Sequence, residues 1–134
     1  MVAEKFEIAE NKYEFFEFIR KLRNNREVNK GFVERDEISL VSHLEYMKKY
    51  GKNYFICLKN KTPVGYVGVI EGDIRVAVSP EFQGSGAGTF MIKKIIEKNP
   101  NSFAKIKVEN NKSISLFKKC NFKIKYYILE IDGE

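Results

Sequence analysis

The sequence predicts an α/β domain in which helices flank both faces of a mixed β-sheet. Extended apolar runs alternate with segments of helical periodicity in the order β-α-α-β-β-β-α-β-α-β, and the last run is long enough for two strands. Two short turns join the three middle strands, which is typical of an antiparallel meander. The strand–helix–strand unit that follows needs a parallel crossover. We therefore expect about six to seven strands and about four helices in a single domain, residues 1–134.

The first 50 residues contain one expected strand and two expected helices. Residues 5–9 form the strand. Asn11, followed three residues later by Glu14, has the pattern of a capping box that starts the first helix. The polar stretch 25–36 is expected to be a loop or an irregular helix. A second amphipathic helix follows it, and Gly51 is well placed to end that helix.

The remaining chain alternates between short strands and helices, with Pro80 and Asn99-Pro100 as stop signals. The expected strands are 54–58, 64–70, 74–78 and 103–108, the expected helices are 89–98 and 111–120, and 122–131 forms one long strand or two short ones.

The most informative segment is the glycine-rich loop 83–88, Gln-Gly-Ser-Gly-Ala-Gly, which lies between a strand and a helix. The first turn of a helix has backbone N–H groups without intrahelical partners, and the helix dipole makes this end positive. Glycines remove Cβ atoms and permit positive φ angles, so that such a loop can fold around an anion. We expect a phosphate or pyrophosphate there. The loop lacks the lysine of a P-loop and the glycine spacing of a dinucleotide fingerprint.

This loop resembles motif A of the GNAT superfamily of N-acetyltransferases, Gln/Arg-x-x-Gly-x-Gly/Ala, at Gln83, Gly86 and Gly88. Residues 76–80 also match the Val-x-Val-x-Pro that precedes the motif. Residues 109–122 resemble the family's motif B, Glu-Asn-x-x-Ala/Ser-x-x-Leu-Tyr-x-Lys-x-Gly-Phe. One helix and one strand separate the two motifs, as in the family. The resemblance covers essentially the whole chain and implies the GNAT fold.

The resemblance also implies a function, namely transfer of an acetyl group from acetyl-CoA to a primary amine in a ternary complex. In the family, backbone groups bind the pantetheine arm and the pyrophosphate, and a backbone N–H polarises the thioester carbonyl. No metal is expected. The residues that the resemblance assigns to the cofactor are Val76, Ala77, Val78, Gln83, Gly84, Ser85, Gly86, Ala87, Gly88, Thr89, Asn110 and Phe117.

The catalytic residues depart from the family pattern. Phe117 occupies the position of the tyrosine that often protonates the leaving thiolate, and phenylalanine has no proton to donate. Lys105 stands where some members carry a glutamate base. Glu71 and Asp73 are candidate bases because they lie near the strand that precedes motif A, and Cys120, one helical turn after Phe117, is a candidate acid. Water is the alternative.

The acceptor is suggested by two blocks, residues 22–28 and 38–44. Both resemble blocks of GNAT members that acetylate nucleotide-linked amino sugars, and similar blocks occur in enzymes that acetylate ribosomal-protein N-termini. Arg23, Arg26 and His43 are the candidate substrate-binding residues. A nucleotide-linked amino sugar or another small amine is the favoured acceptor. The alternatives are acetylation of a protein N-terminus or lysine, and a catalytically impaired acyl-CoA-binding module.

Composition sets the remaining expectations. The net charge is +6, but the lysines are scattered, so we expect an anionic small molecule and not a nucleic acid as partner. No apolar run approaches the roughly 20 residues of a membrane span, and the N-terminus lacks a signal-like apolar core, so a cytoplasmic protein is expected. Cys57 and Cys120 are expected to be buried thiols. A monomer or a homodimer is expected, the latter through residues 126–131.

Overall fold

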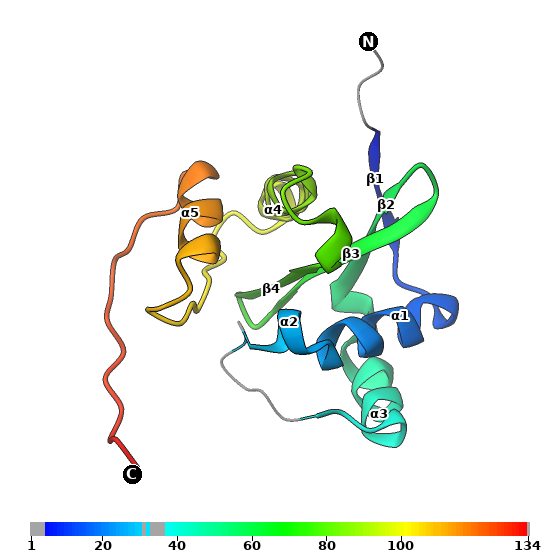
Figure 1. Cartoon of the computed structure of the whole chain (residues 1–134), viewed down its shortest axis with the longest axis horizontal. Coiled ribbons are helices and arrows are strands. Elements are labelled where there is room, and N and C mark those ends of the chain that lie inside the picture. The colour runs from blue at the N-terminus through cyan, green and yellow to red at the C-terminus, as the bar shows by residue number, and fades with distance from the viewer. Residues whose placement is uncertain (1–4, 31, 33–36, 134) are drawn as a thin grey trace.

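A computed structural model of the chain describes residues 5–30, 32 and 37–133. Its centre is an antiparallel sheet in the order β1-β2-β3-β4 (Figure 1). The strands are β1 (Phe6–Glu10), β2 (Tyr54–Lys59), β3 (Thr62–Ile70) and β4 (Asp73–Val78). The predicted meander is confirmed, because β2, β3 and β4 pair successively through two tight turns.

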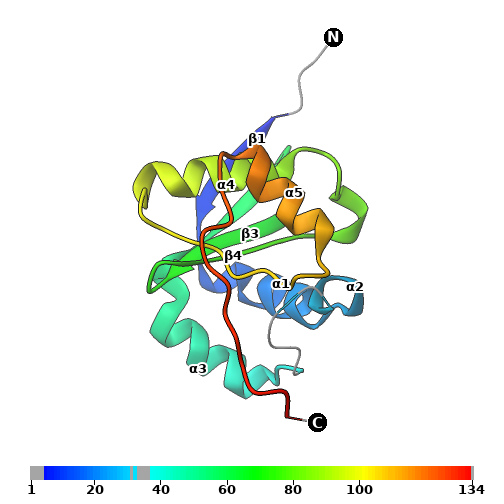
Figure 2. The same ribbon diagram turned by 90° about the vertical axis from the view of Figure 1, so that its left-hand side faces the viewer.

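The described residues form five α-helices, which lie in two layers, one on each face of the sheet (Figures 1 and 2). They are α1 (Tyr13–Asn24), α2 (Arg26–Asn29), α3 (Leu40–Tyr50), α4 (Ala87–Lys98) and α5 (Asn111–Lys119). Short 3₁₀ turns, η1 (Gly51–Asn53) and η2 (Pro80–Phe82), precede β2 and the glycine loop. One apolar core lies between the sheet and α4 and α5, and a second between the sheet and α1 to α3.

The alternation of side chains along β4 divides it between the two cores. Ile74, Val76 and Val78 pack in the core beneath α4, whereas Ala77 packs in the core beneath α1. On the neighbouring strand, a Cβ atom at Gly65 would lie 2.8 Å from Met91 Cε and 2.5 Å from the backbone oxygen of Ala77. Glycine at this position therefore allows α4 to pack closely on the sheet, which fixes the loop that precedes the helix.

The prediction of a mixed sheet with six to seven strands is corrected, since the described residues form four antiparallel strands. The segment 103–108 touches β4 only through one parallel bridge, between Asp73 and Phe103. The segment 122–131 is extended but is not paired as a strand (Figure 1). Both segments have the apolar pattern of strands, but a strand also needs a partner along its length, and among the described residues neither segment has one beyond the bridge at Phe103.

One local prediction is also corrected. The capping box of Asn11 and Glu14 does not form, because no side chain caps the first turn of α1. Asn11 Nδ2 instead donates to the backbone oxygen of Gly51, at 3.1 Å, which ties the end of β1 to the end of α3. The stretch 25–36, predicted to be a loop or an irregular helix, begins with α2, which Asn25 caps. Most of the rest of that stretch lies outside the described residues.

Candidate active site

The glycine loop leaves open space at the N-terminus of α4. Gly84 and Gly86 have φ angles of 81° and 96°, in the left-handed region that strongly favours glycine. A Cβ atom at Gly84 would meet no atom within 4 Å, and one at Gly86 would meet only Phe6, at 3.9 Å. Loop conformation therefore explains these two glycines, and the volume in front of them is free for a ligand.

The start of α4 has backbone donors without backbone acceptors among the described residues. Ser85 shapes the loop, because its N–H and its hydroxyl both donate to the backbone oxygen of Phe82, at 3.3 and 2.6 Å. The first intrahelical bond runs from Phe90 N–H to the Gly86 oxygen, at 3.0 Å. Within the described chain, the N–H groups of residues 86–89 have no backbone acceptor. Unpaired N–H groups at a helix start are the kind of donor set that binds phosphate groups, and a pyrophosphate at this loop stays a prediction.

Gly88 is small for a different reason. It is buried inside α4, and a Cβ atom there would lie 2.9 Å from Leu116 Cδ2 on α5. The side of Gly88 therefore faces α5, and only its backbone N–H remains for a ligand. Asn110, predicted to contact the cofactor, caps α5, since its Oδ1 accepts from Ser113 N–H at 3.2 Å.

The half of β4 that leads to the glycine loop has a free edge. Ile74 N–H donates to the Phe103 oxygen and Phe103 N–H donates to the Gly72 oxygen, both at 2.8 Å. Beyond these two bonds, segment 103–108 no longer pairs with β4. Because alternate residues of a strand point their backbone groups the same way, Val76 directs its N–H and C=O to the open edge as Ile74 does. The carbonyl of Val78 accepts from Gln83 Nε2, at 3.3 Å, and this contact holds the loop against the strand.

The two motif B candidates are buried. Phe117 is 5% exposed, and its ring meets that of Phe122 edge-on at 5.1 Å. Cys120 belongs to the same core, and burial raises the pKa of its thiol, so it stays protonated. Cys57 is also buried, which raises the pKa of its thiol to about 11. Both cysteines are free thiols, as predicted.

The candidate bases lie at the opposite end of β4 from the glycine loop. Glu71 is exposed in the β3–β4 turn with a φ angle of 51°. Asp73 Oδ2 is 3.2 Å from Arg75 Nε in an ion pair. Since a strand rises about 3.3 Å per residue, Asp73 is roughly 10 Å from Val76 along β4. Lys105, at the family's other base position, is exposed.

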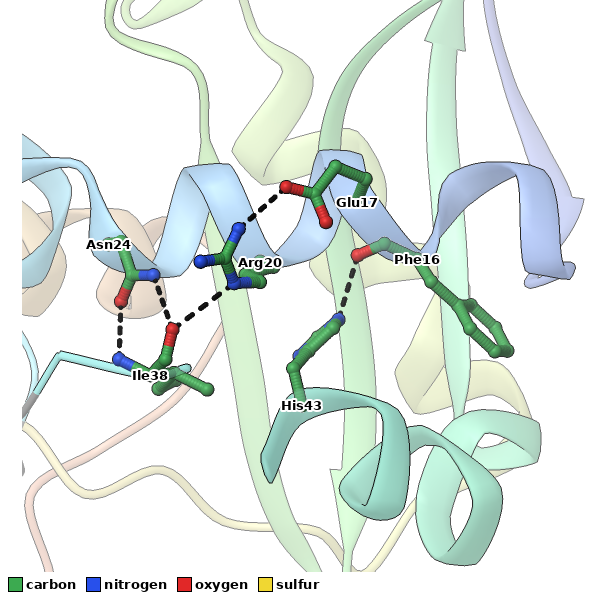
Figure 3. Close-up of polar contacts among 6 residues, drawn as sticks. All are labelled: Phe16, Glu17, Arg20, Asn24, Ile38 and His43. Atoms are coloured by element: carbon green, nitrogen blue, oxygen red, sulfur yellow. Dashed lines mark hydrogen bonds and ion pairs between the residues drawn. The ribbon is translucent and has the colours of Figure 1, made fainter. Parts of the chain in front are cut away.

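The acceptor candidates on α1, α2 and α3 occupy different environments, and His43 is the one that contacts the backbone of α1 (Figure 3). His43 is fully buried, and its Nε2–H donates to the Phe16 oxygen at 2.7 Å. Burial lowers the pKa of its imidazole, and Nδ1 has no partner among the described residues. The guanidinium of Arg23 lies over the ring of Tyr46, 4.8 Å from its centroid. Arg26 is exposed at the start of α2. The structure therefore gives His43 a packing role and leaves the arginines at the surface of this layer.

The segment that leads into α3 is attached to α1 by two side chains (Figure 3). Asn24 makes both hydrogen bonds to the backbone of Ile38, at 2.8 and 2.9 Å. Arg20 Nε donates to the Ile38 oxygen at 3.2 Å, and Arg20 Nη1 pairs with Glu17 at 2.7 Å. These contacts fix α3 relative to α1, and with it the tyrosines that α3 carries.

A cluster of tyrosines near Arg75 was not predicted from the sequence. The hydroxyls of Tyr46 and Tyr54 are 2.7 Å apart, and the Tyr54 ring meets the ring of Tyr66 edge-on at 5.7 Å. Burial raises the pKa of Tyr54 and of Tyr66, so both hydroxyls stay protonated. The positive charges of Arg23 and Arg75 act on Tyr66 in the opposite direction. The sequence signal was weak, because these residues come from α3, β2, β3 and β4, and only the fold brings them to one face.

A separate hollow of about 460 Å³ lies between β1, β2 and α4, away from the β4 edge. Its lining includes Phe6, Phe55 and Phe90. Among the described residues, no group of three or more His, Cys, Asp or Glu side chains is arranged to hold a metal ion. None of the described helices has the length and hydropathy to cross a membrane.

Comparison with known proteins gives a family match and several structural matches. Residues 12–122 match the acetyltransferase (GNAT) family. No curated protein matches the chain significantly. Among solved structures, the chain resembles spermidine N-acetyltransferase from Vibrio cholerae, in complex with CoA and spermine, with a TM-score of 0.81 and 22% identity over 93% of this chain and 85% of that chain.

Two further structures share the fold. Ribosomal-protein-alanine N-acetyltransferase from Brucella melitensis aligns with a TM-score of 0.72 and 16% identity, over 87% of this chain and 84% of that chain. An acetyltransferase from Salmonella typhimurium, with its cofactor acetyl-CoA, aligns with a TM-score of 0.74 and 16% identity, over 90% and 81%. These identities are low, so the structural likenesses bear on the fold alone.

Proposed function

The chain belongs to the GNAT family of acetyltransferases, and from this premise we propose that it transfers the acetyl group of acetyl-CoA to a primary amine. The observation that carries the proposal is the loop at the start of α4, which adjoins the free edge of β4. Its glycines have left-handed conformations, and four of its N–H groups have no backbone acceptor in the described part of the chain. The loop would bind the pyrophosphate, and the edge at Val76 would bind the pantetheine arm as an added strand.

In the proposed reaction, acetyl-CoA supplies an activated thioester. The neutral amine attacks the carbonyl carbon, the C–S bond breaks, and the thiolate leaves with CoA. The outward N–H of Val76 would stabilise the negative charge that develops on the carbonyl oxygen. The amine loses its proton to water, and water protonates the thiolate, because Phe117 has no proton to donate and Cys120 is buried with a raised pKa.

We propose that the acceptor amine is carried by an anionic molecule, such as a nucleotide-linked amino sugar. Two arginines support this proposal, since Arg23 and Arg26 lie on the α1 to α3 side of the sheet, and the chain carries a net charge of +6. A polycation such as the spermine bound by the Vibrio cholerae enzyme would be repelled by this charge. A protein N-terminus or lysine side chain is the second candidate acceptor.

A non-catalytic acyl-CoA-binding module is the second candidate function, favoured by one observation. Phe117 fills the proton-donor position of motif B and packs edge-on against Phe122 in the core. A module of this kind would bind acetyl-CoA without turnover.

Calorimetric titration with acetyl-CoA, followed by thiol release with a panel of amines, tests both functions. Saturable 1:1 binding with thiol release above the hydrolysis background supports transfer, and the most active amine identifies the acceptor class. Binding without release from any amine supports the module. No binding up to millimolar acetyl-CoA would contradict both, and would mean that the glycine loop is only a turn.

A further inference from the structure

The face of β4 that looks toward α1 carries Arg75. Ile74 packs in the core beneath α4 and Ala77 in the core beneath α1, so alternation along the strand puts Arg75 on the same face as Ala77. The cross-strand pairs agree, because Arg75 is opposite Gly68 and Gly68 is opposite Tyr54. A Cβ atom at Gly68 would lie 2.7 Å from Tyr54 Cδ1, so the Tyr54 ring lies over Gly68. Arg75 therefore projects beside the tyrosine cluster.

The guanidinium of Arg75 is held on one side and open on the other. Its Nε donates to Asp73 Oδ2 at 3.2 Å, and its side chain is 42% exposed. Within the described part of the chain, its two terminal nitrogens have no hydrogen-bond partner. Asp73 fixes the side chain in this way and offsets part of its charge. The terminal nitrogens remain available for a carboxylate or a phosphate, but an anion would need a second cation nearby.

Lys105 stands at the level of Arg75 on the neighbouring segment. The segment 103–108 starts beside β4, where a parallel bridge pairs Asp73 with Phe103 (Figure 2). In a parallel arrangement both chains advance together, so two residues further along Lys105 corresponds to Arg75. The two side chains therefore lie on either side of the free edge of β4.

The side chain of Lys105 also lies on the α1 to α3 face. Ala104 and Ile106 pack against the core beneath α4, so alternation puts Lys105 and Lys107 on the opposite face. Lys107 supports this, because its Nζ donates to the backbone oxygen of Lys30, at the end of α2, at 3.2 Å. Lys105 is exposed, and its Nζ makes no hydrogen bond or ion pair with the residues that the structure describes.

We propose that Arg75 and Lys105 form a clamp for an oxyanion of the acceptor, a carboxylate or phosphate group that lies within a few bonds of the reacting amine. The inference rests on the proposed function, in which Val76 N–H binds the thioester carbonyl at this edge. The core beneath α4 and α5 closes the other face, so the amine reaches the carbonyl from the α1 to α3 face. Arg75 directly precedes Val76, so groups next to that amine lie between the two cations.

Tyrosine hydroxyls add neutral donors beside the clamp. The hydroxyls of Tyr46 and Tyr54 are 2.7 Å apart, so one donates to the other and the proton of the second remains for a ligand. The guanidinium of Arg23 lies over the Tyr46 ring, at 4.8 Å from its centroid, and adds positive charge to the same layer. The carboxylate of Asp73 is already engaged by Arg75. This combination of groups favours an oxyanion over a polyamine.

A titration followed by NMR tests the clamp without turnover. O-phosphoethanolamine and ethanolamine differ in the phosphate, and alanine and alaninamide differ in the carboxylate. Each is added to the protein with CoA and again without it. We expect the member with the oxyanion to bind at least about tenfold more tightly in one or both pairs, which identifies phosphate or carboxylate as the preferred group. Equal binding within both pairs would overturn the proposal.

Substitutions then assign the preference to the clamp. Arg75→Gln and Lys105→Gln should each remove most of the difference within a pair, because each deletes one of the two cations. The matched control is Lys12→Gln, an exposed lysine at the start of α1 that follows β1, the opposite edge of the sheet. This control should keep the full difference. A preference that survives both clamp substitutions would overturn the proposal.

Thiol release from acetyl-CoA with the same amines separates the clamp from the proposed reaction. Lys105→Gln should raise the KM for O-phosphoethanolamine about tenfold more than the KM for ethanolamine, and Lys105→Glu should lower the KM for spermidine. If no amine gives thiol release while the preference in the titration persists, the transfer function fails and the clamp stands. Release with the same KM values in the wild type and in Lys105→Gln would overturn the clamp and leave the transfer function.

Discussion

At the scale of residues, the loop requires glycine at different positions for two separate reasons. Gly84 and Gly86 adopt positive φ angles beside open space, whereas Gly88 accommodates Leu116 of α5 at its side. A side chain at the first two positions would strain the loop and fill the ligand space. A side chain at Gly88 would push two helices apart. Binding and stability should therefore respond differently to matched substitutions.

Gly86→Val should weaken acetyl-CoA binding at least tenfold with little loss of helix content, because a β-branched residue resists the left-handed conformation that aligns the N–H groups. Gly88→Val should instead lower the thermal midpoint, through overpacking of about 1–3 kcal/mol against Leu116. Calorimetry and thermal unfolding measure the two effects. Unchanged affinity in Gly86→Val would remove the assignment of the loop to the pyrophosphate.

Phe117→Tyr should leave kcat unchanged or raise it, since it restores a proton donor at the family position. The thermal midpoint should fall slightly, because the added hydroxyl enters a core in which Phe117 is 5% exposed. Phe122→Tyr is the control, as it alters the other ring of the edge-on pair. A large loss of kcat in Phe117→Tyr alone would show that Phe117 packs against the acetyl group or the acceptor.

His43 makes stability depend on pH. It is the only histidine of the chain, it is buried, and burial lowers the pKa of its imidazole. Its contribution is fully present above the unfolded pKa of about 6.5 and is lost as pH falls, by up to about 1.4 kcal/mol per pH unit, because the unfolded chain then binds a proton that the native state resists. The thermal midpoint should therefore fall between pH 7 and 5.5. The fall should be smaller in His43→Gln, and an equal fall there would assign it to other groups.

Residues of the candidate site could be predicted from the sequence where their role is local. The loop glycines belong to one short motif, so their pattern indicates a strand, a turn and a helix start without knowledge of the fold. The capping role of Asn11 was wrong because its amide contacts Gly51, far along the chain. The tyrosines around Arg75 were not predicted for the same reason, since they come from three separate elements and Arg75 comes from a fourth.

At the scale of elements, one edge of β4 pairs with β3, and the other edge is free at Val76. A proline substitution distinguishes the two edges, because proline has no N–H. Val76→Pro removes an N–H that points to the open edge, which a strand tolerates, and should lower kcat/KM about 10²–10³-fold while the fold persists. Ala77→Pro removes an N–H that faces β3 opposite Tyr66, and should destabilise the sheet. Thiol release and circular dichroism measure the outcomes. Full activity in Val76→Pro would exclude this N–H as the carbonyl donor.

The order of the elements was largely predictable, and the pairing of the last two predicted strands was not. The meander, α3, α4 and α5 each follow from periodicity and turn signals within a short window. Residues 103–108 and 122–131 have the same apolar pattern, but strand formation depends on what lies beside them. The segment 103–108 leaves β4 after one bridge, and residues 122–131 have no strand partner in the part of the chain that the structure describes. A pattern thus predicts extended backbone, and the partner of that backbone remains a separate question.

At the scale of the whole molecule, the excess of positive charge separates the candidate acceptors. The chain carries a net charge of +6, and its ion pairs include Glu17 with Arg20, Glu27 with Lys30 and Asp73 with Arg75. Each pair joins one carboxylate to one cation, so the excess of +6 comes from basic side chains outside these pairs. The electrostatic field of this excess charge attracts anions and repels cations. At about 0.1–0.15 M salt, screening limits both effects to a distance of about 8–10 Å.

Salt should therefore change the apparent affinity for the two acceptor classes in opposite directions. Between about 20 and 300 mM NaCl, we expect the KM for a nucleotide-linked amino sugar to rise several-fold and the KM for spermidine to fall, at saturating acetyl-CoA. Acetyl-CoA is also an anion, so its affinity should weaken with salt, and calorimetry measures that effect separately. A matched variant, Arg23→Gln, should reduce the salt dependence for the anionic acceptor only. If the KM for spermidine also rises with salt, local carboxylates govern the acceptor site, and the anionic acceptor is excluded.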